Sequence, residues 1–135
     1  AREVQSGAGT QTSAIAAGGN TPGNNYAIVE EYIGSALSEV ADLNSARNTA
    51  GGFGANAEAT ICYGGRDPGA TRAYTESWNG SSWTEVANLN AGNQNQGSCG
   101  TQTAALAFGG DGGTNLTETY GFKLMSCLRA QDLLK

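Results

Sequence analysis

Three short apolar runs divide the chain into segments of similar length. The runs cover residues 13–17, 59–63 and 104–108, and each leads into a Gly-Gly pair that begins at 18, 64 or 109. The spacings of 46 and 45 residues identify an internal repeat. A continuous apolar run of about five residues bounded by glycine is typical of a strand covered on both faces. Each run therefore predicts a buried strand.

Three further strands are predicted around each buried strand. A glycine-rich strand precedes it at Gln5–Gly9, Thr49–Gly54 and Gln96–Gly100. After a polar loop comes an amphipathic strand at Ile28–Tyr32, Tyr74–Trp78 and Leu116–Tyr120. A fourth strand is expected at Ala36–Val40 and Ser82–Val86. About 45 residues with four strands per unit is the period of β-propeller blades. The chain is thus expected to be all-β, with blades at 1–44, 45–90 and, incomplete, 91–122.

The third and fourth strands of the second unit meet at a short turn. Asn79-Gly80 predicts a tight type I′ hairpin, because both residues tolerate the positive φ that this turn needs. Trp78 and Trp83 flank the turn and recur as Tyr32 and Leu37 in the first unit. Since a tryptophan that stacks on sugars more often lies on a variable loop, we expect both to be structural.

The third unit departs from the pattern after Tyr120. The expected Ser-Trp-Thr-Glu-Val is absent, and a divergent tail covers residues 123–135. Leu124, Cys127, Leu128 and Leu134 follow a helical spacing, which predicts a short amphipathic helix. Alternatively, Lys123–Leu128 supplies the missing fourth strand.

Composition narrows the possible partners. Glycine makes up 21 of 135 residues and proline only 2, which indicates many tight turns. The net charge of −5 without a basic cluster argues against nucleic acid. No apolar run approaches the ~20 residues of a membrane span, so membrane insertion is not expected. A charged fraction of 14% is typical of an extracellular or virion protein more than of a cytosolic enzyme.

The chain has three cysteines, at 62, 99 and 127. An odd number without metal-ligand spacing fits neither a disulfide framework nor a zinc site. Cys62 lies inside an apolar run and is interpreted as a small buried hydrophobic residue. A Cys62–Cys99 disulfide between neighbouring units remains an alternative.

No catalytic or cofactor motif is evident. The absence of histidine excludes serine–histidine catalysis within this chain. A glutamate recurs once per unit, as Glu30 or Glu31, Glu76 and Glu118. A residue that every unit repeats is expected to be a structural hydrogen-bond acceptor. The loop 111–115 lacks the alternating oxygen ligands of a calcium loop. We therefore expect no enzyme activity, no cofactor and no metal.

The loops that follow the Gly-Gly pairs differ in length and in nearly every residue. In an antiparallel four-strand unit, this loop opens on the same side as the connection between units. The loops Asn20–Asn25, Arg66–Arg72 and Asp111–Asn115 should therefore share one face, which is the candidate ligand site. The candidate binding residues are Asn24, Tyr26, Arg66, Asp67, Arg72, Asp111 and Asn115. The alternative is that these loops are only solvated.

The unit resembles a kelch repeat. The matching features are Arg47 at the start, Tyr63-Gly64-Gly65, Glu76-Ser77-Trp78-Asn79, and Trp83 followed by Leu89. Residues 75–80 and 100–110 are also similar in wording to the kelch-like repeats of marine bacteriophage tail fibres and other structural proteins. The resemblance implies that Gly64-Gly65 lets blades approach and that both tryptophans pack between blades.

The same resemblance implies a non-enzymatic structural or binding module. Its most specific form is a virion or tail-fibre component that contacts a host-surface protein or glycan. A lectin-like propeller outside any virus is the alternative. An enzyme built on a propeller scaffold is a weaker third interpretation, because such a site needs residues that break the repeat.

Three units cannot close a propeller ring, which needs at least four blades. Two copies of the chain could form a six-bladed ring, further blades could lie in a longer chain, or the blades could stack openly. Self-association is favoured, because open faces would leave large apolar patches exposed. The tail at 123–135 could then dock on a partner chain.

Overall fold

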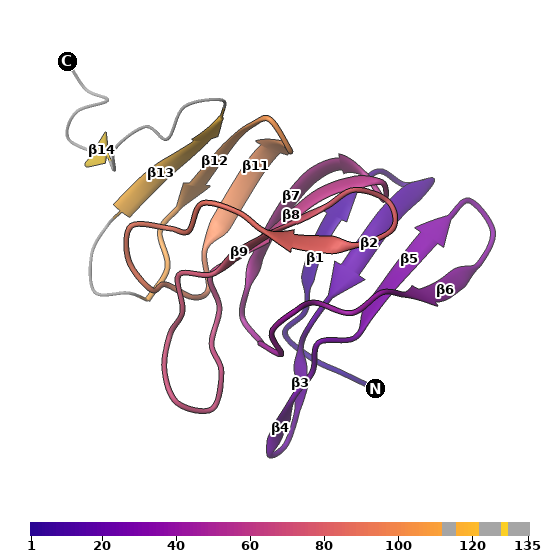
Figure 1. Cartoon of the computed structure of the whole chain (residues 1–135), viewed down its shortest axis with the longest axis horizontal. Coiled ribbons are helices and arrows are strands. Elements are labelled where there is room, and N and C mark those ends of the chain that lie inside the picture. Colours follow the sequence, from indigo (N-terminus) through magenta and orange to yellow (C-terminus); the bar gives the residue numbers. More distant parts are fainter. Residues whose placement is uncertain (112–115, 122–127, 130–135) are drawn as a thin grey trace.

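The computed structural model describes residues 1–111, 116–121 and 128–129, and every regular element within them is a β-strand. Three four-stranded antiparallel sheets lie next to one another along the molecule (Figure 1). No helix in the described residues is long and apolar enough to cross a membrane. The prediction of an all-β chain is therefore confirmed for the part that the structure describes.

The strands of each sheet follow one another in the chain. The first sheet has the order β1 (Ser6–Gly9), β2 (Ser13–Ala17), β5 (Val29–Ile33) and β6 (Leu37–Val40). The second sheet consists of β7 (Gly51–Asn56), β8 (Ala59–Tyr63), β9 (Thr75–Trp78) and β10 (Trp83–Glu85). The third sheet consists of β11 (Gly97–Thr101), β12 (Ala104–Phe108), β13 (Leu116–Gly121) and β14 (Leu128–Arg129). A separate small hairpin is formed by β3 (Asn20–Thr21) and β4 (Asn24–Asn25).

The three sheets repeat the same backbone. The last residue of the buried strand pairs with an equivalent residue in each, as Ala17 with Val29, Tyr63 with Thr75, and Phe108 with Thr117. The positive φ values of non-glycine residues recur in step at Val4, Thr49 and Asn95, near 58°, 51° and 56°. The period of about 45 residues read from the sequence is thus also the period of the structure.

The tail contributes the fourth strand of the third sheet, at the position that β6 and β10 occupy in the first two sheets. Leu128 and Arg129 pair with Thr117 and Leu116 at the outer edge of the third sheet. The predicted amphipathic helix is wrong at these two residues, because their backbone pairs with β13. The rest of the predicted helix and of the alternative strand at Lys123–Leu128 lies outside the described residues, at 123–127 and 130–135.

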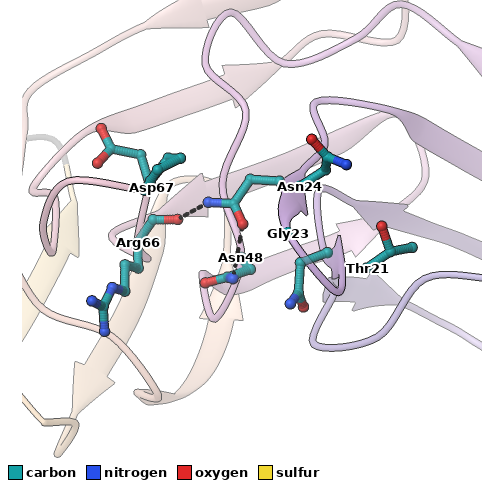
Figure 2. A pocket seen from close by; sticks show the side chains of 9 residues that line it. Thr21, Gly23, Asn24, Asn48, Arg66 and Asp67 are labelled. Atoms are coloured by element: carbon teal, nitrogen blue, oxygen red, sulfur yellow. Dashed lines mark hydrogen bonds between the residues drawn. The ribbon is translucent and has the colours of Figure 1, made fainter.

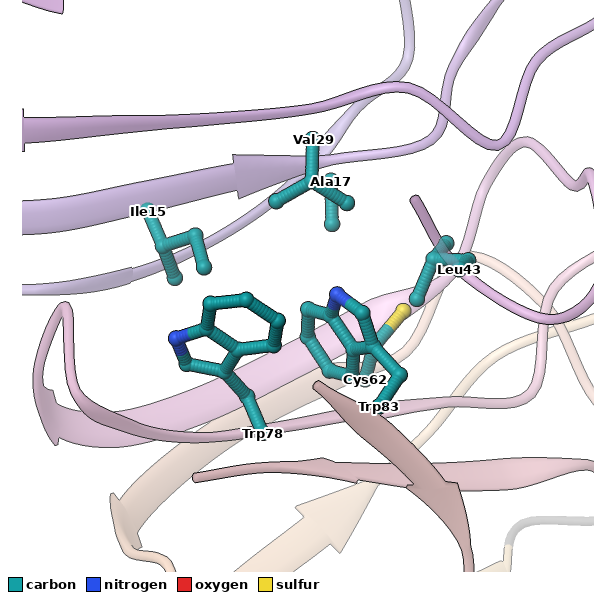
Figure 3. Close-up of a cluster of buried hydrophobic side chains, with 7 residues drawn as sticks. All are labelled: Ile15, Ala17, Val29, Leu43, Cys62, Trp78 and Trp83. Carbon is teal, nitrogen blue, oxygen red and sulfur yellow. The ribbon is translucent and has the colours of Figure 1, made fainter. Parts of the chain in front are cut away.

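Two hydrophobic clusters lie between consecutive sheets. The cluster between the first and second sheets consists of Ile15, Ala17, Val29, Leu43, Cys62, Trp78 and Trp83, drawn in Figure 3. The cluster that reaches the third sheet consists of Phe53, Ile61, Tyr63, Leu89 and Ala107. The ring centroids of Trp78 and Trp83 lie 5.2 Å apart with the ring planes tilted by 38°. The indole N–H of Trp83 donates to the backbone oxygen of Ala41 in the first repeat. Both tryptophans are buried, which confirms the structural role expected for them.

A buried ion pair fixes the start of the second repeat to its third strand. The guanidinium of Arg47 pairs with Glu76 and donates to the carbonyls of Gly64 and Tyr74. The second carboxylate oxygen of Glu76 accepts from the backbone and the amide of Asn44, at 2.7 and 2.9 Å. Because Asn44 belongs to the first repeat, this glutamate also connects two sheets.

The other two repeats vary this arrangement. Arg2 pairs with Glu30, which identifies Glu30 rather than Glu31 as the repeated glutamate. In the third repeat Asn93 replaces the arginine and donates to Gly109 at 2.9 Å. Burial there raises the pKa of Glu118, and a hydrogen bond from the backbone of Asn90 opposes this shift. The expectation that these glutamates are structural acceptors agrees with all three sets of contacts.

Two local predictions are wrong. The turn after Trp78 is a four-residue loop, because Trp78 pairs directly with Trp83 and Asn79 donates to Ser82 at 3.3 Å. Only Gly80 has a positive φ there, whereas type I′ needs two such residues. The side chain of Asn79 accepts from the backbone of Ser81 and Ser82, which holds the loop without that geometry.

The alternative of a Cys62–Cys99 disulfide is also wrong. Both thiols are free, and Cys62 is buried between the first and second sheets. Cys99 pairs with Leu106 in the third sheet and is exposed on the face turned away from the second. Burial raises the pKa of the Cys62 thiol, which keeps it protonated and apolar.

Candidate functional site

The first two variable loops meet at one edge of the sheets. The hairpin β3–β4 forms the first loop, and the second runs from Arg66 between β8 and β9. Both project from the lower side of the molecule in Figure 1. The sequence pattern predicted that these loops share one face, because the loops between the second and third strands of successive sheets open on the same side.

Hydrogen bonds hold the two loops together. The amide of Asn25 donates to the backbone oxygen of Arg66 at 2.9 Å and accepts from Asn48 at 3.0 Å. Asn48 and Arg66 are also joined by two backbone hydrogen bonds, at 2.8 and 3.0 Å. Figure 2 shows the two hydrogen bonds of Asn25 as dashed lines that start from the labelled residues Arg66 and Asn48. The loops are therefore positioned relative to each other by the connection between the first two sheets.

A hollow of about 260 Å³ lies between these loops. It is lined by Asn20, Thr21, Gly23, Asn24, Asn25, Asn48, Arg66, Asp67 and Pro68. Four of the nine lining residues are asparagines, whose amide groups can donate and accept at the same time. The amide oxygen of Asn20 has no hydrogen-bond partner among the described residues. The hollow thus offers both donors and acceptors to a polar ligand.

Charge within the hollow is uneven. Asp67 is held by Arg72, whose guanidinium donates at 2.5 Å, and by the backbone N–H groups of Gly69 and Ala70. These bonds hold the pKa of the Asp67 carboxyl at about 2, below its ordinary 3.8. Within the described part of the chain, the guanidinium of Arg66 makes no hydrogen bond or ion pair. Arg66 is therefore the charged group that remains available to a ligand.

Seven binding residues were predicted from the sequence, and only three of them line the hollow. Asn24, Arg66 and Asp67 line the hollow. Arg72 and Tyr26 lie behind it, since Arg72 orients Asp67 and the hydroxyl of Tyr26 lies 3.3 Å from Thr21. Asp111 is not among the lining residues and accepts from Asn95, and Asn115 lies outside the described residues. The third loop is thus not part of this hollow in the described structure.

Asn25 and Asn48 join the two loops, but neither is among the binding residues predicted from the sequence. Asn48 follows directly after Arg47, in the connection between the first two units, and this connection was expected to open on the face of the loops. The position of Asn48 in this connection could therefore have marked it as a residue near the loops. No signal in the sequence marked Asn25 as the residue that joins both loops.

A pH titration tests whether Arg72 holds the carboxylate of Asp67 in the second loop. A carboxyl whose pKa is lower in the folded state stabilises that state above its ordinary pKa, and the contribution is lost as the pH falls through the lower value. For Asp67 the window runs from about 4 down to about 2. We expect a carboxyl NMR titration of Asp67 with a midpoint near 2 and, in Arg72→Gln, a midpoint shifted toward 3.8. An unshifted midpoint in Arg72→Gln would show that the guanidinium does not hold the carboxylate.

Within the described residues, no group of three or more histidine, cysteine, aspartate or glutamate side chains is arranged to hold a metal ion. In comparisons with known proteins, no family model and no curated protein matched the chain. The site is therefore interpreted from its own geometry and from the sequence pattern.

Proposed function

We propose that the three sheets are kelch-like propeller blades and that the chain is a non-enzymatic binding module whose loop edge contacts a glycan. The strand order within each sheet supports the blade assignment. So does the contact of β7 with β1 on one side and with β11 on the other, because the first strands of successive blades are neighbours in a propeller.

The hollow between the β3–β4 hairpin and the loop after β8 is the observation that carries this proposal. Its size of about 260 Å³ and its lining of amide side chains suit a sugar, whose hydroxyl groups both donate and accept. Arg66 adds a donor of fixed geometry that favours sugars carrying a carboxylate. Proteins that present such loops on a rigid sheet scaffold commonly use them for recognition.

The proposal leaves no catalytic role for the repeated glutamates. Glu76 is enclosed by Arg47 and Asn44, and Glu118 accepts from the backbone of Asn90. Both carboxylates accept from the end of the preceding repeat and are not among the residues that line the hollow, so they have structural partners rather than a substrate. A placement in a virion or an extracellular setting is supported by the low fraction of charged residues, 14%, and by the resemblance to phage repeats.

A glycan array tests the proposed ligand class. We expect the wild-type chain to bind a subset of sugars with a preference for acidic ones. Arg66→Ala and Asn24→Ala should each lower the affinity by about tenfold, since each removes one or two hydrogen bonds to the ligand. Glu58→Ala is the matched control, because Glu58 is exposed at the β7–β8 turn, at the opposite end of the strands. A flat response across all sugars would contradict the proposal.

A further inference from the structure

The two contacts between sheets follow one pattern. Each sheet turns one face toward the following sheet, and we call this its trailing face. The opposite face, which meets the preceding sheet, is its leading face. The trailing face of the first sheet provides Ile15, Ala17 and Val29, and the leading face of the second provides Cys62, Trp78 and Trp83. The next contact uses the same two faces, with Phe53, Ile61 and Tyr63 against Ala107. Ile61 and Tyr63 are equivalent to Ile15 and Ala17, and Ala107 is equivalent to Cys62.

Two faces have no neighbouring sheet in the described structure. On the leading face of the first sheet, Leu37 is opposite Tyr32 as Trp83 is opposite Trp78. Leu37 is 68% exposed, whereas Trp83 is 6% exposed. On the trailing face of the third sheet, Phe108 is 42% exposed although its equivalent Tyr63 is fully buried. The described structure thus has one apolar face open on its first sheet and one open on its third sheet. Each corresponds to the half of an internal contact that would cover the other.

Two equivalent glycines on the leading faces differ in the space around them. Gly7 pairs with Ala16 as Gly52 pairs with Cys62, so the two glycines are equivalent. A Cβ on Gly52 would overlap Ser6 and lie 3.1 Å from the backbone oxygen of Gly7, because β1 runs directly beside it. A Cβ on Gly7 would have no atom closer than 3.8 Å. The space beside Gly7 therefore matches a strand that the described residues do not supply.

The Gly-Gly pairs give the same result at the other end. A Cβ on Gly18 would lie 2.5 Å from the backbone oxygen of Arg47, and one on Gly64 would lie 2.6 Å from that of Asn93. In both cases the start of the following repeat covers the glycine. The equivalent Gly109 has no such neighbour within 4 Å among the described residues. The start of a further repeat would fit over it.

A hydrogen-bonding side chain is also left without its partner. Gln102, in the β11–β12 turn, donates to Ser77 at 2.9 Å, to Thr60 at 3.4 Å and to the backbone oxygen of Trp78. The first repeat carries the same Thr-Gln-Thr sequence, with Gln11 in place of Gln102. Gln11 is exposed, and the hydroxyl of Thr119, which is equivalent to Ser77, has no partner among the described residues.

We propose that the leading face of the first sheet packs on the trailing face of the third sheet of a second copy of this chain. Two such contacts, related by a two-fold axis, join two chains into a closed ring of six sheets. Gln11 of one copy then occupies the place of a hydrogen-bond donor to Thr119 of the other. The occupant is a second copy because the two open faces repeat the two halves of the internal contacts. This inference rests on the blade assignment above but not on the ligand.

Solution mass tests the association. We expect the wild-type chain to sediment at twice its 13.7 kDa. Gly7→Val should halve this mass while its circular dichroism spectrum stays unchanged, because only the second copy lies near the added side chain. Cys99→Arg should do the same from the exposed trailing face. Ile33→Asp is the matched control, since Ile33 is 55% exposed but pairs with Ser13, on the face opposite Leu37, and should leave the dimer intact.

Mixing the two monomeric variants distinguishes this arrangement from other dimers. The Gly7→Val chain keeps an intact trailing face and the Cys99→Arg chain an intact leading face, so their mixture should form a dimer through one contact. A symmetric contact of like faces cannot be restored in this way. A folded wild-type monomer, or variants that remain monomeric when mixed, would overturn the inference. Either result with unchanged sugar binding would leave the proposed function standing.

Discussion

Replacing Glu76 with glutamine is expected to lower the free energy of unfolding by about 3–5 kcal/mol, because it leaves the charge of Arg47 buried without a counter-charge. The side chains of Arg47 and Glu76 are 1% and 2% exposed, so solvent cannot compensate for the loss. Glutamine keeps the size of the side chain and can still accept from Asn44. The effect therefore reports the lost charge rather than a cavity. Urea unfolding followed by circular dichroism measures it.

Glu30→Gln is the matched control for this experiment. Glu30 has the equivalent position and pairs with Arg2, but its side chain is 40% exposed. Ion pairs open to solvent contribute about 0–1 kcal/mol, so we expect a change within that range. Equal losses for Glu76→Gln and Glu30→Gln would contradict the view that burial between the sheets sets the strength of this pair.

Trp78→Ala should destabilise the chain by a comparable amount, about 3–5 kcal/mol. Trp78 is 1% exposed and packs against the first sheet together with Trp83 and Cys62 (Figure 3). Its removal leaves a cavity between two sheets that their backbones cannot close. Thermal unfolding should show a lower midpoint for both sheets in one transition, because they share this cluster.

Trp78→Phe separates packing from hydrogen bonding. The indole N–H of Trp78 has no partner among the described residues, so its loss should cost little beyond the smaller ring. Trp83→Phe removes a hydrogen bond of 3.1 Å to Ala41 as well. We expect Trp83→Phe to lose about 1 kcal/mol for this bond in addition to the smaller ring. A larger loss for Trp78→Phe would contradict this account of the cluster.

The strands were predictable because they repeat. The apolar runs before Gly18-Gly19 and Gly64-Gly65 coincide with β2 and β8, because a short apolar segment bounded by glycine is typical of a strand. Of these two strands, only β8 is covered on both faces in the described structure. The positive φ of these glycines, between 62° and 99°, explains why the pair recurs. Strand boundaries shifted by one or two residues where turns, rather than burial, end the strand.

Features set by contacts between distant residues were not predictable. The turn at Asn79-Gly80 depends on the direct pairing of Trp78 with Trp83, which composition alone does not fix. The hollow depends on Asn25, whose amide reaches a backbone oxygen 41 positions away. A pattern of neighbouring residues contains no information on such a bridge. The sequence could therefore indicate which loops share an edge, but not which side chains build the site.

The position of the bound sugar is the most direct test of the proposed function. In ¹⁵N–¹H spectra titrated with a sugar that binds on the array, we expect shifts concentrated at Asn20–Asn25, Asn48 and Arg66–Asp67, around the hollow in Figure 2. The β7–β8 turn at Ala57 and Glu58 should remain unchanged. Shifts concentrated at that turn, with none around the hollow, would contradict the account.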